Sequence, residues 1–192
     1  MTNNNKVLFL TNNDYGPASL VLAIAYELVV HGCEVHIASF NTNKELGPSL
    51  TNRVQDLNNG EYGALPKDSK PITLHLVDGQ SVEQTYLTKK NIDLEGYTYI
   101  EACGARAASR NSKALLDIFD FENLAYLTGM KDLASVIKNI QPNVVAVDYL
   151  CAEARAAVTT LELRHYIILS HSSSKFIMTG ADLRYQMWNF PP

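Results

Sequence analysis

The chain has 192 residues, of which 46% are hydrophobic and 19% are charged, and its formal net charge is −4. This length is enough for one domain with a full core and short for two, so we expect a single domain over residues 1–192. The weakly acidic charge argues against a nucleic-acid partner, and no apolar run approaches the roughly 20 residues that a membrane span needs.

The first forty residues predict two strands with a helix between them. Val7–Leu10 is an apolar run of the kind that is buried on both faces of a sheet. Turn-forming residues follow in Asn12–Pro17. Apolar residues then recur at helical spacing up to Leu28, and Gly32 is a stop signal. Val35–Phe40 returns to strand character, which completes a β–α–β unit.

The middle of the chain predicts one further strand and mostly helical structure. The strand covers Ile72–Val77. Leu94–Met130 is expected to be largely helical, with breaks near Asn111 and Gly129, and another helix covers Lys131–Ile140.

The last clear unit again alternates strand, helix and strand. Val144–Val147 is an apolar strand with Asp148 at its carboxyl end, and Cys151–Leu161 is an alanine-rich helix. Tyr166–Leu169 is the next strand, followed by the polar turn Ser170–Lys175. Strands that alternate with helices predict an α/β fold, a doubly wound parallel sheet with helices on both faces.

Polar loops follow three of the predicted strands at their carboxyl ends, where open parallel sheets bind ligands. These loops are Asn12–Pro17, Asp148–Leu150 and Ser170–Ser174. Taken singly, each has a structural explanation, since Asn and Asp stabilise turns and Asp148 could serve only as the N-cap of the next helix. Three such loops at one edge favour a small-molecule site.

We select the candidate site residues from these loops. The residues expected to act in catalysis are Tyr15, Asp148 and His171. The residues expected to contact the substrate are Asn12, Asn13, Asp14, Pro17, Ser19, Tyr149, Ser172 and Ser173. Their hydroxyl, amide and imidazole groups can polarise a carbonyl, and Asp148 can orient one of them.

Cofactor, metal and hydrolase motifs do not occur in the sequence. Gly16 stands alone before Pro17, so no GxGxxG loop cradles a pyrophosphate. The histidines show no HExxH or paired metal spacing, and we expect neither a metal nor a cofactor. Ser172, His171 and Asp148 suggest a hydrolase triad, but no GxSxG elbow accompanies them.

The cysteines and the N-terminal residues indicate the cytosol. The chain has 3 cysteines, an odd number, and no CxxC pair that would suggest zinc or redox chemistry. No basic segment followed by an apolar core stands at the N-terminus. We therefore expect a cytoplasmic protein without a secretory signal.

Two long stretches carry a resemblance to a known family. They are VLFLTNNDYGPASLVLAIAYELVVHG and QPNVVAVDYLCAEARAAVTTLELRHYIIL, the second leading into the turn ILSHSSS. Both are similar to the N-terminal, acceptor-binding domain of fungal UDP-sugar-dependent glycosyltransferases. The resemblance implies half of a GT-B architecture, in which two such domains face each other across a cleft.

The resemblance also implies roles for particular positions. In the family, a histidine in the first turn deprotonates the acceptor hydroxyl, and an aspartate after a later strand orients that histidine. Asp148 falls on the position of the aspartate, whereas Pro17 falls on that of the histidine and has no titratable group. The UDP-sugar-binding domain of the family has no counterpart before Pro192, so we expect a truncated chain that transfers no sugar alone.

Three functions stay open on these observations. In the first, the chain is a stand-alone acceptor domain of natural-product biosynthesis that binds a small apolar intermediate. It would catalyse a cofactor-free cyclisation or isomerisation, for instance a pericyclic step of Diels–Alder type. In the second, it is a non-catalytic partner or split half, which pairs with a second copy or docks on a full-length glycosyltransferase. In the third, it is a piece of a longer glycosyltransferase.

Overall fold

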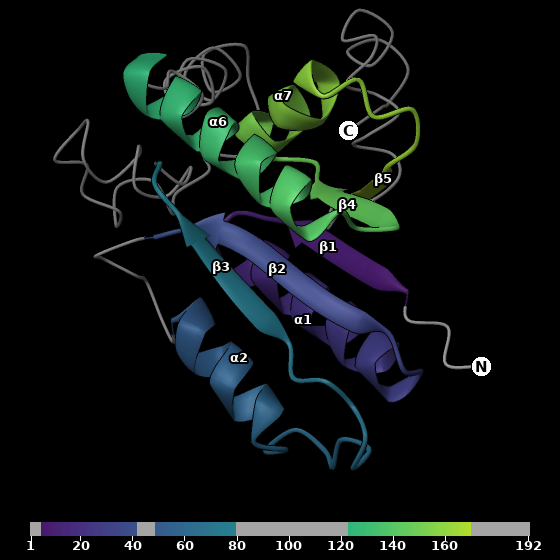
Figure 1. Cartoon of the computed structure of the whole chain (residues 1–192). Helices are drawn as coiled ribbons and strands as arrows, with labels where there is room; N and C mark the ends of the chain where they lie inside the picture. Colours follow the sequence, from purple (N-terminus) through teal and green to yellow (C-terminus); the bar gives the residue numbers. More distant parts are fainter. Residues whose placement is uncertain (1–4, 42–48, 80–122, 170–192) are drawn as a thin grey trace, which may run out of the picture.

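The computed structural model describes residues 5–41, 49–79 and 123–169 (Figure 1). Its elements are, in chain order, β1 (Lys6–Leu10), α1 (Tyr15–Val30), β2 (Glu34–Phe40), α2 (Leu50–Asn58), β3 (Thr73–Val77), α6 (Asn123–Ile140), β4 (Val144–Asp148), α7 (Ala152–Thr160) and β5 (Ile167–Leu169). The 5 strands form one sheet in the order β3-β2-β1-β4-β5, and every pair is parallel. The predicted parallel α/β fold is confirmed.

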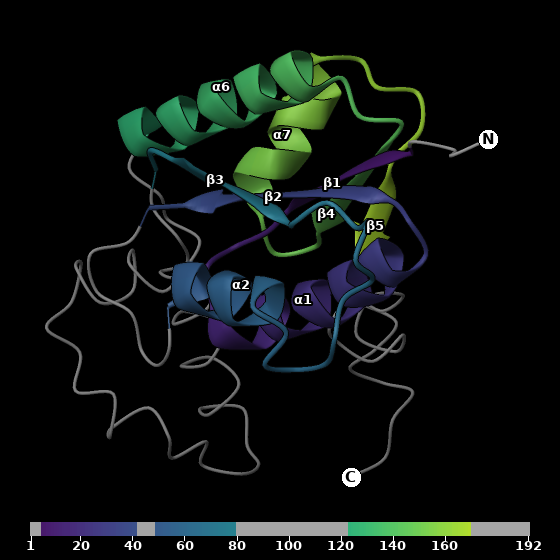
Figure 2. The same cartoon turned by 60° about the horizontal axis from the view of Figure 1, so that its bottom comes forward.

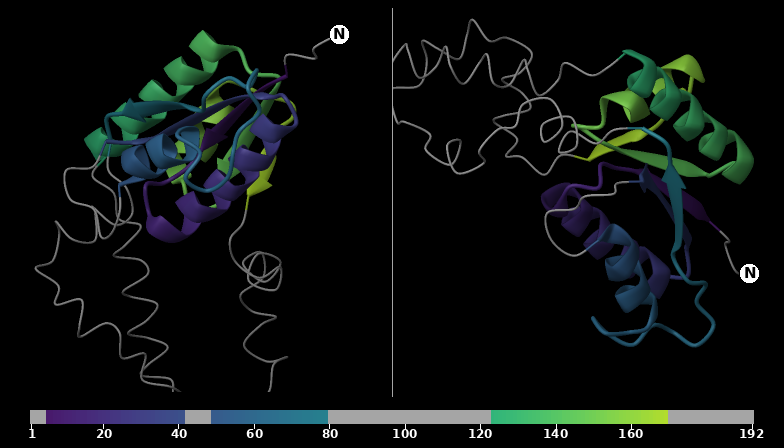
Figure 3. Two further views of the ribbon diagram at one scale, coloured as in Figure 1. Left: turned by 90° about the horizontal axis from the view of Figure 1, so that it is seen from below. Right: turned by 90° about the vertical axis from the view of Figure 1, so that its left-hand side faces the viewer.

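Helices cover both faces of the sheet, as the sequence predicted. Helices α1 and α2 lie on one face, and α6 and α7 lie on the other (Figures 1 and 2). The right-hand view of Figure 3 shows the same two helical layers, with the sheet between them. Within the described ranges, no helix is both long and apolar enough to cross a membrane.

Strand β1 is the centre of two apolar cores. Val7 and Phe9 pack with α1 and α2, whereas Leu8 and Leu10 pack on the face of α6 and α7. None of the four side chains is more than 7% exposed. Burying a side chain of this size stabilises the fold by about 1.5–3 kcal/mol. Because successive side chains of β1 point to opposite faces, this one strand contributes to the packing of both helical layers.

Helix α1 begins earlier than the sequence predicted. The turn expected over Asn12–Pro17 ends at Asp14, which is the N-cap of α1. Pro17 therefore lies in the first helical turn, where a backbone N–H has no intrahelical acceptor and its absence costs little. The proline is buried in this turn, so it starts the helix instead of delaying it.

The helix break predicted near Gly129 is wrong, because α6 runs without interruption from Asn123 to Ile140. A Cβ atom at position 129 would lie 2.9 Å from Cε1 of Phe40, closer than real Cβ contacts come. Phe40 is fully buried and has little room to move. The glycine thus allows α6 to approach the sheet closely. The predicted break near Asn111 lies outside the described residues, as does the turn Ser170–Lys175.

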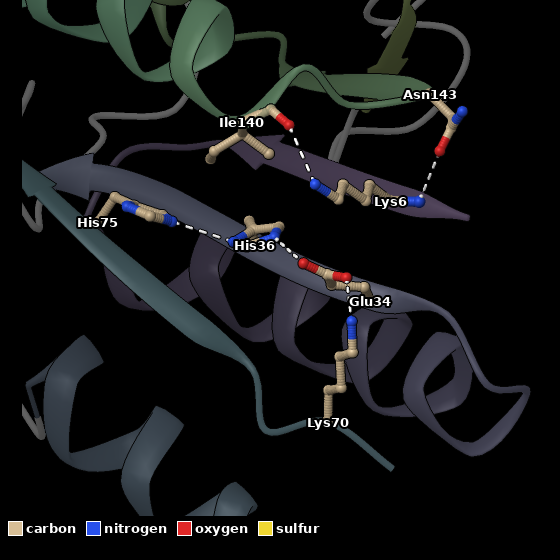
Figure 4. A network of polar contacts seen from close by, with 7 residues as sticks. All are labelled: Lys6, Glu34, His36, Lys70, His75, Ile140 and Asn143. Carbon is tan, nitrogen blue, oxygen red and sulfur yellow. Dashed lines mark hydrogen bonds and ion pairs between the residues drawn. The ribbon is translucent and has the colours of Figure 1, made fainter. Parts of the chain in front are cut away.

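A row of polar side chains begins at the amino end of β2 and crosses to β3 (Figure 4). Nδ1 of His36 lies 3.1 Å from Nε2 of His75, and Nε2 of His36 lies 3.1 Å from Oε1 of Glu34. Lys70 pairs with the second oxygen of Glu34. Burial and the neighbouring His36 lower the pKa of His75. These side chains provide hydrogen-bond and ion-pair partners for one another. They stabilise the sheet at a distance from the predicted site.

Replacing Gly129 by alanine tests why α6 carries a glycine. Alanine favours a helix by about 1 kcal/mol over glycine, but overpacking a core costs about 1–3 kcal/mol. We therefore expect Gly129→Ala to lower the free energy of unfolding, measured by urea denaturation. Adding Phe40→Leu should weaken the effect of Gly129→Ala, because the obstructing ring is gone. A Gly129→Ala protein more stable than the wild type would contradict the packing explanation.

Candidate functional site

The carboxyl ends of β1 and β4 meet at the topological switch point of the sheet. The two strands are neighbours, with Leu10 paired to Val147, and the chain leaves them in opposite directions along the sheet. After β1 it passes through α1 on one face to β2. After β4 it passes through α7 on the opposite face to β5 (Figure 2). Open parallel sheets bind ligands at such a point.

Asp148 forms hydrogen bonds with both of the loops that follow β1 and β4. Asp148 is 2% exposed, and its Oδ2 accepts a hydrogen bond from Oγ1 of Thr11 at 3.3 Å. The same oxygen lies 3.5 Å from the backbone N–H of Asn12, and Oδ1 accepts from the backbone N–H of Leu150 at 3.0 Å. Asp148 is not the N-cap of α7, a position that Cys151 takes. The structure thus brings Asp148 and Asn12 together.

Asn12 is buried at the end of β1, and its side chain has no partner among the described residues. The residue is 1% exposed, and in the described part of the chain neither Oδ1 nor Nδ2 has a hydrogen-bond partner. Leaving such a group unpaired costs about 1–3 kcal/mol. Buried polar groups in folded proteins are nearly always paired, so this amide at a ligand-binding position requires an explanation.

The other predicted residues of these loops have varied surroundings. Asn13 and Asp14 are half-buried between β1 and α1, and Pro17 is buried in α1. The ring of Tyr149 lies under the guanidinium of Arg155, 5.6 Å from its centroid to the guanidinium carbon. Three predicted residues lie outside the described part of the chain: His171, Ser172 and Ser173.

Tyr15 and Ser19 both contact Arg53, a residue that the sequence did not indicate as part of a site. Ser19 Oγ donates to the backbone oxygen of Tyr15 at 2.6 Å and accepts from Nη2 of Arg53 at 2.7 Å. The guanidinium carbon of Arg53 lies 4.5 Å from the centroid of the Tyr15 ring, a cation–π distance. The start of α1 is thereby connected to the first half of α2.

A cavity of about 360 Å³ opens between α1 and α2 beside this cluster. Its volume lies near the lower end of the roughly 300–1,000 Å³ of small-molecule sites. Leu22, Ala23 and Leu57 form the aliphatic part of the lining. The polar and aromatic part consists of Tyr15, Ser19, Tyr26, Glu27, Arg53 and Tyr62.

A buried carboxyl group lies on the opposite face, in the first turn of α7. Glu153 is 1% exposed, and its Oε1 has no hydrogen-bond partner within the described ranges. Burial raises the pKa of Glu153 to about 7. Burial, and after it the charge of Glu153, raise the pKa of Cys151 well above its usual value. A carboxyl group with a pKa near neutrality can exchange a proton at physiological pH.

Stability should depend on pH through Glu153. Its folded-state pKa of about 7 exceeds the ordinary value of 4.5, so the stabilisation is complete below pH 4.5 and is lost as the pH rises through about 7. Between about pH 5 and about pH 8.5, the wild type should lose about 2–3 kcal/mol relative to Glu153→Gln. Urea denaturation at both pH values measures this. Glu61→Gln, at an exposed loop position, is the control. Parallel pH profiles for the wild type and Glu153→Gln would contradict the burial effect.

Arg53 and Glu153 share a sequence signal that identifies them in retrospect. Each stands on the apolar stripe of its helix: Arg53 lies between Leu50 and Leu57 at core spacing, and Glu153 precedes Ala157 by one turn. A charged residue at such a position is buried with the stripe. In the part of the chain that the structure describes, no group of three His, Cys, Asp or Glu residues is arranged to hold a metal ion.

Comparisons with known proteins give a match in fold. No protein-family model matches the sequence, and no curated protein sequence does either. The crystal structure of TcCGT1 in complex with UDP matches 98% of this chain and 33% of its own length, with 12% identity and a TM-score of 0.55. The crystal structure of glycosyltransferase VinC in complex with DTDP matches 97% of this chain and 39% of its own length, with 17% identity and a TM-score of 0.52.

These matches define the class of fold. The chain has a glycosyltransferase-like α/β fold, equivalent to one half of a GT-B enzyme, as the sequence resemblance implied. It spans between 33% and 39% of the length of the two glycosyltransferases. A fold shared at this level of identity hosts many functions, so the function has to come from the side chains at the site.

Proposed function

We propose that the chain binds a small apolar molecule at the switch point between β1 and β4 and catalyses its cyclisation or isomerisation without a cofactor. The observation that carries this proposal is the Asn12 amide, which is buried without a partner in the described part of the chain. A ligand with a carbonyl or hydroxyl group would supply the missing hydrogen bonds and offset the cost of burial.

Three side chains divide the work in this proposal. Nδ2 of Asn12 donates a hydrogen bond to a carbonyl oxygen of the substrate and stabilises the negative charge that develops there. Asp148 is a positioning residue, because it lies 3.5 Å from the backbone N–H of Asn12 and holds the loop in place. Tyr15, at the start of α1 and 57% exposed, offers a second donor.

The reaction is balanced within the substrate. In a closure of Diels–Alder type, two carbon–carbon σ bonds replace two π bonds, and no atom or electron enters or leaves the molecule. Such a step requires a cavity that holds the reactive conformer and a donor that polarises one carbonyl. The chain would then serve natural-product biosynthesis, in which unsaturated apolar intermediates carry carbonyl groups.

Replacing Asn12 by leucine separates function from stability. Leucine is similar in size and carries no polar atom, so Asn12→Leu should raise the free energy of unfolding of the ligand-free protein by about 1 kcal/mol. The same change should slow substrate conversion about 10- to 1,000-fold, because one donor is lost. Urea denaturation measures the first effect. Mass spectrometry of a metabolite extract incubated with the protein measures the second, as a product of unchanged mass and shifted retention time.

Ser39→Ala is the matched control for this experiment. The Ser39 hydroxyl is also buried without a partner in the described residues, but it lies on β2. Ser39→Ala should not slow conversion. If Asn12→Leu is less stable than the wild type, the amide has a structural role and the proposal fails. If Asn12→Leu converts substrate at the wild-type rate, the catalytic role is wrong.

We expect UDP and UDP-glucose not to bind this chain tightly. A diphosphate needs several free backbone N–H groups, and the start of α1 offers Gly16 followed by Pro17, which has none. The neighbouring carboxyl groups of Asp14 and Asp148 also disfavour an anion at this edge. Calorimetric titration with both nucleotides tests the expectation, and a low-micromolar dissociation constant for either one would overturn it.

A second function, that of a non-catalytic partner, has its own supporting observation. Strand β5 exposes Ile167 by 52% and Ile168 by 49%. An edge strand with exposed apolar side chains can pair with another chain, here a second copy or a full-length glycosyltransferase. This function takes precedence if Asn12→Leu leaves conversion unchanged. Light scattering on the purified chain would then test the second copy, which a strictly monomeric mass excludes.

A further inference from the structure

We propose that the cavity between α1 and α2 binds a planar aromatic molecule that carries a single carboxylate, with Arg53 as its anion-binding residue. The cavity shares Tyr15 and Ser19 with the site that we predict at the carboxyl edge of the sheet. The inference itself stands on Arg53, Tyr26 and Tyr62, and it does not require catalysis at Asn12. It concerns binding only and involves no covalent step.

The charge of Arg53 is the first support for this ligand. Arg53 is 8% exposed, and in the described part of the chain no carboxylate lies within ion-pair distance of it. One of its five N–H groups donates to Ser19 Oγ at 2.7 Å, and another lies 3.5 Å from the backbone oxygen of Tyr15. The remaining N–H donors have no acceptor among the described residues and can receive a carboxylate. A buried charge without an opposite charge nearby is costly, and an anionic ligand removes that cost.

The walls of the cavity favour an aromatic ligand. Tyr15, Tyr26 and Tyr62 line it together with aliphatic side chains. Tyrosine rings offer flat apolar surfaces that stack on planar molecules. Tyr15 is 57% exposed and Tyr62 is 66% exposed, so both rings can cover a ligand that enters from solvent.

The balance of charge favours a carboxylate over a phosphate. Arg53 is the one cationic side chain among the lining residues that the structure describes, and Glu27 is also part of the lining. A guanidinium matches one carboxylate through two parallel hydrogen bonds, whereas a phosphate dianion would bring twice the charge. Glu27 follows Ser19 by eight residues of α1, or roughly 12 Å, which is long enough for a fused ring system.

A pair of probes that differ only in charge tests the inference. We expect 2-naphthoate to bind about 10- to 100-fold more tightly than the neutral 2-naphthamide, the range of one charge-assisted hydrogen-bonded pair. Calorimetry gives the affinities, and amide chemical shifts in NMR should change at Ala23, Tyr26 and Leu57. Arg53→Met should weaken naphthoate to the level of the amide and leave binding of the amide within about 3-fold.

A second variant keeps the test decisive if Arg53→Met does not fold. Ala23 is an exposed lining residue, so Ala23→Phe fills the cavity without touching Arg53. It should abolish binding of both probes, whereas Val30→Phe, on the same helix and outside the lining, should abolish neither. Asn12→Leu should also leave naphthoate binding unchanged, which separates this inference from the proposed function.

Three results would overturn the inference. The first is no saturable binding of 2-naphthoate, and the second is equal affinity for naphthoate and naphthamide. The third is undiminished binding to Ala23→Phe, which would place the probe elsewhere on the protein. Loss of conversion in Asn12→Leu with intact naphthoate binding would support both proposals independently.

Discussion

The fold depends on the burial of β1 between a strand on each side and a helical layer on each face. Val7–Leu10 has no position that faces water, so the strand must lie in the middle of the sheet. Its parallel register aligns Leu10 with Val147. Thr11 and Asp148 therefore follow at the same edge, and their side chains lie 3.3 Å apart. The position of the candidate site is a consequence of this register.

The sequence predicts features that depend on the burial of many residues and misses those that depend on one contact. All 5 described strands were predictable from their apolar runs, and the closeness of the loops after β1 and β4 followed from their shared carboxyl edge. The continuity of α6 was not predictable, because the glycine at position 129 is explained by the close contact with Phe40 and not by a helix break. Arg53 and Glu153 were missed because helical periodicity tells which face is buried, but not whether a charged side chain on that face has a partner.

Buried polar side chains are paired at the amino end of the described sheet, whereas several near its carboxyl end are not paired within the described residues. At the amino end, Glu34 and His36 are paired with each other and with neighbours. Near the carboxyl end, Asn12 and Glu153 are buried with side-chain atoms that have no hydrogen-bond partner among the described residues. Each such group costs about 1–3 kcal/mol, out of a total stability of about 5–15 kcal/mol for a domain. Natural proteins mostly leave buried polar groups unpaired at functional sites, so these residues mark the carboxyl end as the place to test for one.

In open parallel sheets the fold determines the edge at which ligands bind, and the side chains at that edge determine the chemistry. Pro17, in the first turn of α1, has no proton to accept or donate. The polar side chain at the end of β1 belongs instead to Asn12, whose amide donates and accepts hydrogen bonds without titrating. An amide in that position can hold a carbonyl and stabilise charge on it, but it cannot deprotonate a hydroxyl. That difference is why polarisation of a substrate, and not activation of a sugar acceptor, is the chemistry we propose for this edge.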